Sequence, residues 1–335
     1  MDNISKTIKT EFRSKKIVVV GDLVADQFLH GTIDRISREA PVFIIKHDET
    51  ETLAGGAANA AMNVASLGGR AFLVGAIGND SNGLNLQAVF ETAGVHWKSV
   101  ISSEKLTTTT KVRVLAGQNY AQRQQVVRID YEHEKQIDDE LIEQIKENVA
   151  SATENADAII LSDYGYGVAN KEVAKLCAQI CKEKGIPLLI DSRSRLKTFS
   201  GATTATPNQE EIEQILGENF TEPDCENLRE ELELEALLIT LGNKGMLLVE
   251  KGESPRKIEV IGSKAPVDVT GAGDTVIAAY ALGLASGLGY FESAKLANHA
   301  GGNVVMKKGT ASISIEELCR SLERDSPSDY KTKSQ

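Results

Sequence analysis

Short apolar runs alternate with amphipathic segments along most of this chain. Runs typical of buried strands occupy residues 16–21, 71–77, 158–162, 187–191, 236–241 and 246–250. Helical patterns stand between most of them, at residues 84–93, 139–150, 171–183, 209–216 and 227–234. Strands that alternate with helices predict an α/β fold, in which a mostly parallel central sheet has helices on both faces.

A second group of strand-like segments does not follow this alternation. Residues 28–33, 42–51, 108–115 and 124–129 are β-branched or alternate between apolar and polar positions, and no helical pattern separates the first two. These segments predict a small sheet outside the main fold. After them, Gly55 and Gly56 open an alanine-rich helix that runs through Leu67, and Gly68 with Gly69 ends it.

The loops that follow the predicted strands carry most of the polar and glycine residues of interest. They lie at residues 22–26, 162–167, 191–195, 206–211 and 240–245, and the first of them holds Asp22 and Asp26. Open parallel sheets bind ligands beyond the carboxyl ends of their strands. We therefore expect these loops to line one rim of the sheet.

Composition limits the classes of function. A chain of 335 residues, 41% hydrophobic and 25% charged, can bury a large core in one α/β domain. The net charge of -11 argues against nucleic acid or an anionic membrane as a partner. Residues 1–16 are polar and contain no apolar run, so we expect neither a signal peptide nor a membrane span, and a cytoplasmic location is the default expectation.

Cysteine and histidine spacing gives no sign of a zinc site. The four cysteines form no CxxC pair, and no histidine lies at metal-ligand spacing from another histidine or a cysteine. We expect the cysteines to be reduced core thiols. Any bound metal would then be a hard cation held by oxygen ligands.

The segment from Asp268 to Asp274 places two carboxylates around a glycine turn, directly before an apolar helix at residues 275–284. The N–H groups of such a turn and the start of the helix attract an anion, and Asp274 could accept a proton beside it. Phosphoryl transfer needs this pairing. The alternative reading is a glycine-rich turn in which Asp274 only caps the helix. Neither a P-loop nor a GxGxxG motif is present.

Four motifs occur in an order that is specific for one family. They are Gly55-Gly-Ala-Ala-Asn59, Asn208 with Glu211, Thr240-Leu-Gly242 with Gly245, and the segment from Asp268 to Asp274. In this order the chain resembles the ribokinase-like (PfkB) carbohydrate kinases over residues 16–318. The resemblance implies a three-layer α/β/α kinase domain at residues 16–323, a β-sheet lid near residues 28–51 and 107–130, an N-terminal extension at 1–15 and a loose tail at 324–335.

Within that family, residues 34–42, 125–130 and 161–165 look most similar to heptose 7-phosphate kinases. Three departures affect the expected specificity. Tyr166 and Arg38 stand where those kinases usually have lysine and proline, and residues 191–195 replace an Asp-Pro-Lys-Gly type segment, although Asp191 is retained. No His-x-Gly-His motif of a fused nucleotidyltransferase follows Leu318, so we expect phosphorylation alone.

For catalysis, the resemblance implies that Asp274 is the base that deprotonates the sugar hydroxyl, and that Gly271, Ala272 and Gly273 form the anion hole. It also implies that Asp268 helps to hold a monovalent cation such as K⁺. A simple turn or strand-end role for Asp268 is the alternative.

For the nucleotide, the resemblance implies that Glu211 positions Mg²⁺ through water and that Asn208 lies near the phosphates of ATP. The two residues could equally form a helix cap and its capping box. Thr240, Gly242 and Gly245 would line the ribose and phosphates, and Asn298 would lie near adenine.

For the sugar, the resemblance assigns substrate contacts to Asp26, Gly55, Gly56, Asn59 and Asp163. A phosphate on the acceptor would need cations, for which the small sheet offers Lys111, Arg113, Arg123 and Arg128. A solvated charged face is the alternative for each of the four.

The sequence thus predicts transfer of the γ-phosphoryl group of ATP to a sugar or sugar phosphate, most specifically heptose 7-phosphate. The lid would close over the sugar and exclude water, and lid sheets of two subunits would pair in a homodimer. A kinase for another sugar, sugar phosphate or nucleoside is the first alternative. A catalytically silent sugar or nucleotide sensor is the second.

Overall fold

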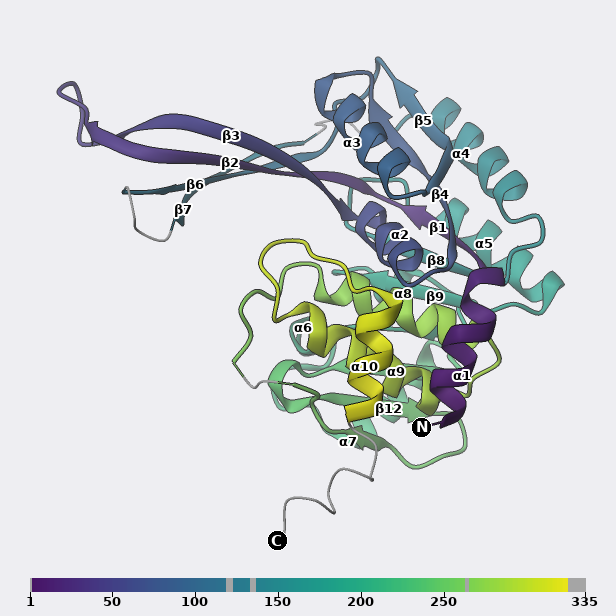
Figure 1. Cartoon of the computed structure of the whole chain (residues 1–335). Helices are drawn as coiled ribbons and strands as arrows, with labels where there is room; N and C mark the ends of the chain where they lie inside the picture. The colour runs from purple at the N-terminus through teal and green to yellow at the C-terminus, as the bar shows by residue number, and fades with distance from the viewer. Residues whose placement is uncertain (1, 119–122, 133–136, 263–264, 325–335) are drawn as a thin grey trace, which may run out of the picture.

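The computed structural model describes residues 2–118, 123–132, 137–262 and 265–324, and it contains two sheets (Figure 1). The large sheet has the strand order β13-β12-β11-β10-β9-β8-β1-β4-β5. Its parallel strands are β1 (Lys16–Gly21), β4 (Arg70–Gly78), β5 (His96–Ser103), β8 (Ala158–Asp163), β9 (Leu188–Ser192), β10 (Thr204–Ala205) and β11 (Ala236–Thr240). At one edge, β12 (Met246–Glu250) runs antiparallel to β11, and β13 (Arg256–Ile258) runs antiparallel to β12.

Successive strand residues enter two separate cores, one on each face of this sheet. In β1, Ile17 and Val19 pack into one core, while Val18 and Val20 pack into the other. Because helices cover both faces of the sheet, the sequences of its strands are continuous apolar runs.

The first core is covered by α1 (Asp2–Glu11), α2 (Ala57–Ser66), α3 (Ser81–Thr92), α8 (Ala272–Ala285), α9 (Tyr290–Val304) and α10 (Ile315–Arg324). The second is covered by α4 (Asp139–Ala152), α5 (Lys171–Lys184), α6 (Gln209–Leu216) and α7 (Glu222–Glu231). Three short 3-10 helices, η1 (Phe12–Ser14), η2 (Leu196–Thr198) and η3 (Gly242–Lys244), complete the helices of the described ranges. The predicted three-layer α/β/α arrangement is confirmed.

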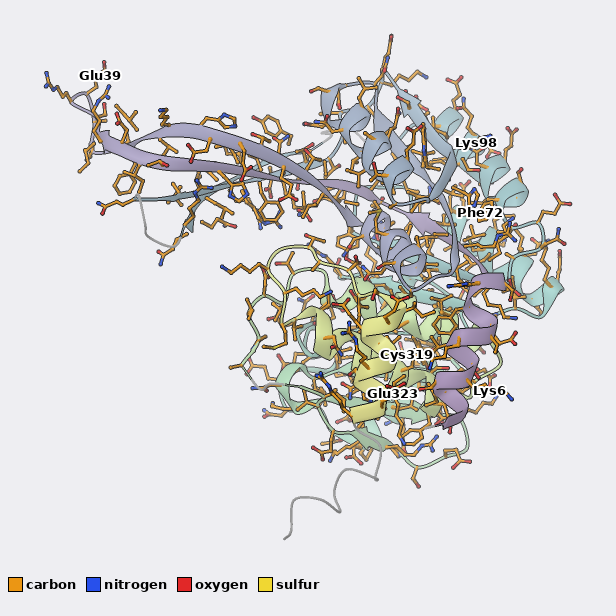
Figure 2. All side chains as sticks on the ribbon, in the orientation of Figure 1. Lys6, Glu39, Phe72, Lys98, Cys319 and Glu323 are labelled. Carbon is orange, nitrogen blue, oxygen red and sulfur yellow. The ribbon has the colours of Figure 1, made fainter. Side chains whose placement is uncertain are left out.

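The small sheet has the order β3-β2-β6-β7 and projects from the body as a long arm (Figure 1). It consists of β2 (Leu23–Ile36), β3 (Phe43–Gly56), β6 (Thr110–Gly117) and β7 (Gln124–Tyr131). Glu39 lies at the tip of this arm (Figure 2). The expected small sheet is therefore present, and we call it the lid sheet.

One expectation about this region was wrong. Asp26 was assigned to a loop after β1, but it lies inside β2, where it pairs in register with Leu53 of β3 and Lys111 of β6. Asp22 alone separates β1 from β2. The chain passes from one sheet to the other with almost no loop, because Leu23, Val24 and Ala25 are buried as strand residues.

Residues 1–15, set outside the kinase domain on sequence grounds, include α1. Ile8 and Phe12 are fully buried in the first core, and α1 packs against α10, where Lys9 forms an ion pair with Glu323 (3.8 Å). This helix is an integral part of the fold, at least from Asp2 onward. Of the expected tail at 324–335, residues 325–335 lie outside the described residues.

Sequence periodicity missed strands β5, β10 and β13, and it placed α7 about five residues too late. The four cysteines are buried and unbridged, as expected. Among the described residues, no helix combines the length and apolar character needed to cross a bilayer.

Candidate active site

Asp274 lies in the first turn of α8 and is almost completely buried. Its Oδ2 accepts a hydrogen bond from Nδ2 of Asn59 (2.7 Å), and its Oδ1 accepts one from the hydroxyl of Tyr164 (2.8 Å). Burial raises the pKa of Asp274 to about 6, although both hydrogen bonds lower it. A carboxylate with such a pKa is ionised at neutral pH and remains basic enough to accept a proton.

The turn before α8 needs glycine at one position. Gly271 is the N-cap of α8 with φ of 75°, and a Cβ there would lie 2.5 Å from Nδ2 of Asn59. The N–H of Ala272 donates to the carbonyl of Val269 (3.2 Å). Among the described residues, the N–H groups of Gly271 and Gly273 have no acceptor within the protein, so these two can bind an anion.

Tyr164 reaches Asp274 because the side chain of Asp22 fixes the loop that carries Tyr164. The carboxylate of Asp22 accepts three backbone hydrogen bonds, from the N–H groups of Tyr164 (2.9 Å), Tyr166 (3.0 Å) and Val168 (2.9 Å). Burial raises the pKa of Asp22, and the three N–H groups oppose that shift. Asp22 therefore has a positioning role that sequence reasoning did not assign to it.

Asn59 lies on α2, and its amide group faces the base. Nδ2 of Asn63 donates to Oδ1 of Asn59 (3.1 Å), and the hydroxyl of Thr275 donates to Oδ1 of Asn63 (2.9 Å). This buried chain of hydrogen bonds joins α2 to α8. Asn59 thus orients Asp274. A contact between Asn59 and the sugar stays a prediction.

Asp26, Gly55 and Gly56 meet at the base of the lid sheet. Arg113 of β6 forms an ion pair with Asp26. A Cβ at Gly55 would lie only 2.6 Å from Oδ2 of Asp26, so glycine leaves room for that carboxylate. Gly56 follows as the N-cap of α2. Asp26 is buried, but it retains an oxygen whose nearest protein donor, the hydroxyl of Thr310, is 3.5 Å away.

The four cations of the lid sheet have different surroundings. Lys111 is buried with its Nζ 5.7 Å from the ring centre of Tyr166, and no carboxylate of the described residues lies within ion-pair distance. Burial, and then the charge of Arg193, lower the pKa of Lys111. Arg128 pairs with Asp130 (2.9 Å) and is half exposed, and Arg123 pairs with Asp48 (2.6 Å). Lys111 and Arg113 are therefore shielded from solvent, while Arg123 and Arg128 are more exposed, as in a solvated charged face.

Asp163, expected to bind the substrate, is occupied by protein contacts. It forms an ion pair with Arg195, and it accepts hydrogen bonds from the hydroxyl of Ser192 (2.7 Å) and the N–H of Gly165 (3.0 Å). Its side chain is also almost inaccessible to solvent. Asp163 holds the ends of β8 and β9 together, and its expected contact with the substrate stays a prediction.

Asn208 and Glu211 form a capping box at the start of α6. Oδ1 of Asn208 accepts from the N–H of Glu211 (3.0 Å), and Oε2 of Glu211 accepts from the N–H of Asn208 (2.8 Å). Burial raises the pKa of Glu211. In the described part of the chain no three His, Cys, Asp or Glu side chains converge as a metal site. One carboxylate with a second oxygen to spare does fit Mg²⁺, which keeps most of its water and binds nucleotide phosphates.

Four of the residues expected at the nucleotide line one pocket at the carboxyl end of β11. Its walls include Thr240, Gly242, Gly245 and Asn298, together with Ala272 and Gly273 of the glycine turn. Asn298 is buried, and its Nδ2 donates to the carbonyl of Glu259 (2.7 Å). Asn208 is joined to Thr240 by an isolated parallel bridge. Segments that are distant in sequence therefore meet beside the N-terminus of α8.

Asp268 stabilises the glycine turn, which is one of the two roles that the sequence left open. Its Oδ1 accepts from the N–H of Thr270 (2.9 Å), and its Oδ2 accepts from the N–H of Gly309 (2.9 Å). Burial favours a higher pKa, but these N–H groups and the charge of Arg113 lower it overall. Asp268 thus stays ionised and ties the glycine turn to the segment after α9. A monovalent cation there remains a prediction.

Sequence reasoning missed two side chains that lie close to the base. Tyr164 stood in a segment used only for the family resemblance, and Arg193 stood in a segment noted only as a departure. Both directly follow the end of a parallel strand, β8 or β9. That position is the signal that could have identified them.

A family model agrees with this geometry. The model of the pfkB family of carbohydrate kinases matches residues 14–318. This chain belongs to that family. The expectation of an ATP-dependent carbohydrate kinase is thereby confirmed at the level of the family.

Curated relatives are similar along nearly the whole chain. Bifunctional protein HldE of Hahella chejuensis is 39% identical over 319 residues, which cover 94% of this chain and 65% of that relative. Bifunctional protein HldE of Chromohalobacter salexigens is 40% identical over 327 residues, which cover 96% and 66%. The chain spans slightly less than two thirds of the length of these relatives.

Solved structures share the fold. Arabidopsis thaliana ribokinase, determined with ribose and ATP, matches 92% of this chain and 98% of its own with a TM-score of 0.68 at 24% identity. Escherichia coli phosphofructokinase-2, determined with potassium, also matches 92% of this chain and 98% of its own, with a TM-score of 0.74 at 18% identity. The ribokinase-like fold is confirmed.

Proposed function

We propose that this pfkB-family chain transfers the γ-phosphoryl group of ATP to a hydroxyl of a phosphorylated sugar. Heptose 7-phosphate, giving the 1,7-bisphosphate, is the acceptor that the sequence resemblance favours. The observation that carries the proposal is Asp274: a buried carboxylate with a pKa of about 6, held by two donors at the N-terminus of a helix.

In the proposed reaction, Asp274 takes the proton of the sugar hydroxyl as its oxygen attacks the γ-phosphorus. The new O–P bond forms while the bond to the β-phosphate oxygen breaks, and ADP leaves. The free N–H groups of Gly271 and Gly273 stabilise charge on the phosphoryl oxygens. Mg²⁺, when bound, neutralises nucleotide phosphate charge, and Glu211 would hold it through water.

The nucleotide would occupy the pocket beside Thr240 and Asn298. Apolar side chains of Met246, Val260 and Val276 line its walls, as suits a purine base. Ala272 and Gly273 of the glycine turn also line this pocket, so the phosphates would point toward that turn. A K⁺ ion beside Asp268 would add positive charge to that turn.

The lid sheet supports the proposal that the acceptor carries a phosphate group. Asp26, Lys111 and Arg113 are neighbours in register and share one face of the sheet. Arg113 has a carboxylate partner, whereas Lys111 is a buried cation without one among the described residues. An unpaired buried ammonium is costly, and a phosphate group would compensate it.

The test measures ADP release from ATP and Mg²⁺ with a panel of acceptors, namely heptose 7-phosphate, fructose 6-phosphate, ribose and a nucleoside. The wild type is expected to prefer heptose 7-phosphate. Asp274→Asn should lower kcat by about 10²- to 10⁴-fold, because general-base catalysis typically contributes that factor. The kinase mechanism would be refuted if none of these acceptors supported ADP release, or if Asp274→Asn released ADP at the wild-type rate.

Lys111→Met separates a phosphorylated acceptor from a neutral one. We expect it to raise KM for the sugar phosphate at least about tenfold, since a charge-assisted contact is lost. KM for the unphosphorylated sugar should stay unchanged. Equal effects on both acceptors would contradict a phosphate contact.

A further inference from the structure

Arg193 occupies the position between the two substrate sides of the site. It is the first residue after β9, which lies between β8 and β10 in the large sheet. The chain after β8 reaches Tyr164 on the sugar side, and the chain after β10 reaches Asn208 on the nucleotide side. A long side chain at the carboxyl end of β9 therefore lies between the sugar side and the nucleotide side, where a phosphoryl group would be transferred.

The guanidinium of Arg193 is held close to the base without being neutralised. Its Cζ lies 4.4 Å from the ring centre of Tyr164, whose hydroxyl donates to Asp274. Arg193 is exposed, and no carboxylate among the described residues lies within ion-pair distance of it. By contrast, Arg195, two residues later, is paired with Asp163. The contact with the ring holds the guanidinium beside Tyr164, and its N–H donors have no carboxylate partner among the described residues.

The electrostatic effects of Arg193 extend to both sides of the site. Its charge contributes to lowering the pKa of Asp274 and of Glu211, in each case against a larger effect of burial. The same charge helps to lower the pKa of Lys111. One guanidinium therefore lies near the base, near the predicted magnesium residue and near the buried lysine of the lid sheet.

We propose that Arg193 is a catalytic residue that binds the equatorial oxygens of the phosphoryl group during its transfer. This inference rests on the proposed kinase function. In that transfer, negative charge is spread over three oxygens between the attacking and the leaving oxygen. A planar guanidinium can donate to two of them at once, whereas an ammonium group acts as a single point charge.

The kinetic test compares Arg193→Gln and Arg193→Lys with the wild type, using the best acceptor of the panel. Arg193→Gln should lower kcat by about 10²- to 10³-fold, the typical effect of losing one preorganised donor, while KM for ATP and acceptor changes less than about fivefold. Arg193→Lys should recover only part of the loss. The matched control is Lys197→Gln, which removes an exposed cation of the same loop that pairs with Glu231; it should keep wild-type rates.

A binding measurement makes the inference independent of the acceptor. Calorimetry would compare MgADP alone with MgADP plus aluminium fluoride, a mimic of the phosphoryl group in transfer. Aluminium fluoride should tighten MgADP binding in the wild type and in Lys197→Gln, and much less in Arg193→Gln, while MgADP alone binds all three equally.

The outcomes separate this inference from the proposed function. Absence of ADP release with every acceptor refutes the kinase proposal, and the aluminium fluoride measurement still decides the role of Arg193. A raised KM for the acceptor with unchanged kcat would show that Arg193 binds the acceptor phosphate instead. Wild-type kcat, or equal tightening by aluminium fluoride in Arg193→Gln, would also overturn the inference.

Discussion

At the residue scale, the oxygens of Asp274 each accept one hydrogen bond, and the two donors come from different parts of the chain. Asn59 lies on α2 and Tyr164 follows β8, yet both groups stabilise the ionised form of the same carboxyl. Burial acts in the opposite direction and is the larger effect. The balance leaves a base whose pKa is about 6, so its removal of a proton should become efficient as the pH rises through that value.

The first prediction concerns Tyr164→Phe. Loss of the hydroxyl removes a donor that lowers the pKa of Asp274, so that pKa should rise. A lost hydrogen bond to a charged group of about 1.5 kcal/mol corresponds to about one pH unit. The acidic limb of the profile of kcat/KM against pH, expected near pH 6 in the wild type, should move upward by that amount.

Tyr290→Phe is the control for this prediction, because Tyr290 begins α9 and is remote from the base. Its acidic limb should coincide with that of the wild type. An unchanged limb in Tyr164→Phe would contradict the assigned effect of the hydroxyl on Asp274.

At the scale of elements, the carboxyl end of the large sheet is organised by single side chains that each fix a loop. Asp22 accepts three N–H groups of residues 164–168. Asp163 joins β8 to β9 through Arg195 and Ser192. Asn208 and Glu211 cap α6. These contacts hold the functional loops at fixed positions, which catalysis by orientation requires.

The second prediction concerns Asp22→Asn. An amide offers one acceptor oxygen in place of two, and its NH₂ group would face a backbone donor. We expect a loss of about 2–3 kcal/mol in the free energy of unfolding, measured by urea titration, because a buried N–H is left unsatisfied. The value of kcat should also fall about tenfold or more, since Tyr164 is no longer held in place.

Asp157→Asn is the matched control, because Asp157 accepts one backbone N–H, that of Lys16 (2.7 Å), at the opposite end of β1. It should lose less stability and keep the wild-type kcat. Equal kcat values for Asp22→Asn and the wild type would show that the loop does not depend on Asp22.

At the scale of the whole molecule, the outer part of the lid sheet extends away from the body (Figure 1). Its edge strand β7 is exposed along its full length, and Val127 and Ile129 share one face there with Val112 and Val114 of β6. An exposed apolar edge strand of this length is a surface on which another chain can pair. We propose that a second copy of this chain covers it, which would join the two lid sheets.

The third prediction is that the protein is a dimer and that Val127→Glu makes it a monomer, as measured by sedimentation velocity at micromolar concentration. A charge placed in an apolar interface would remain desolvated without a partner. Leu84→Glu is the control, because Leu84 is an even more exposed apolar residue, on α3. A monomeric wild type, or an unchanged dimer in Val127→Glu, would contradict the lid interface.

The sequence by itself determined the local features of this protein. Apolar periodicity located most strands and helices, because burial on one or both faces imposes a period on neighbouring residues. The glycines before Asp274 marked the turn at the start of α8, because the backbone at Gly271 has a conformation that other residues rarely adopt. The ordered motifs were sufficient to predict the family and the fold.

Only the tertiary structure decided which side chains meet. It brought Tyr164 and Asn59 to Asp274, and it paired Asp163 with Arg195. It also placed β9, and with it Arg193, between the sugar and nucleotide sides, and it buried Ile8 of α1 in the core. Periodicity reports which face of an element is buried but not which element covers it. Those contacts depend on strand order and packing across distant segments of the chain, which a local pattern does not encode.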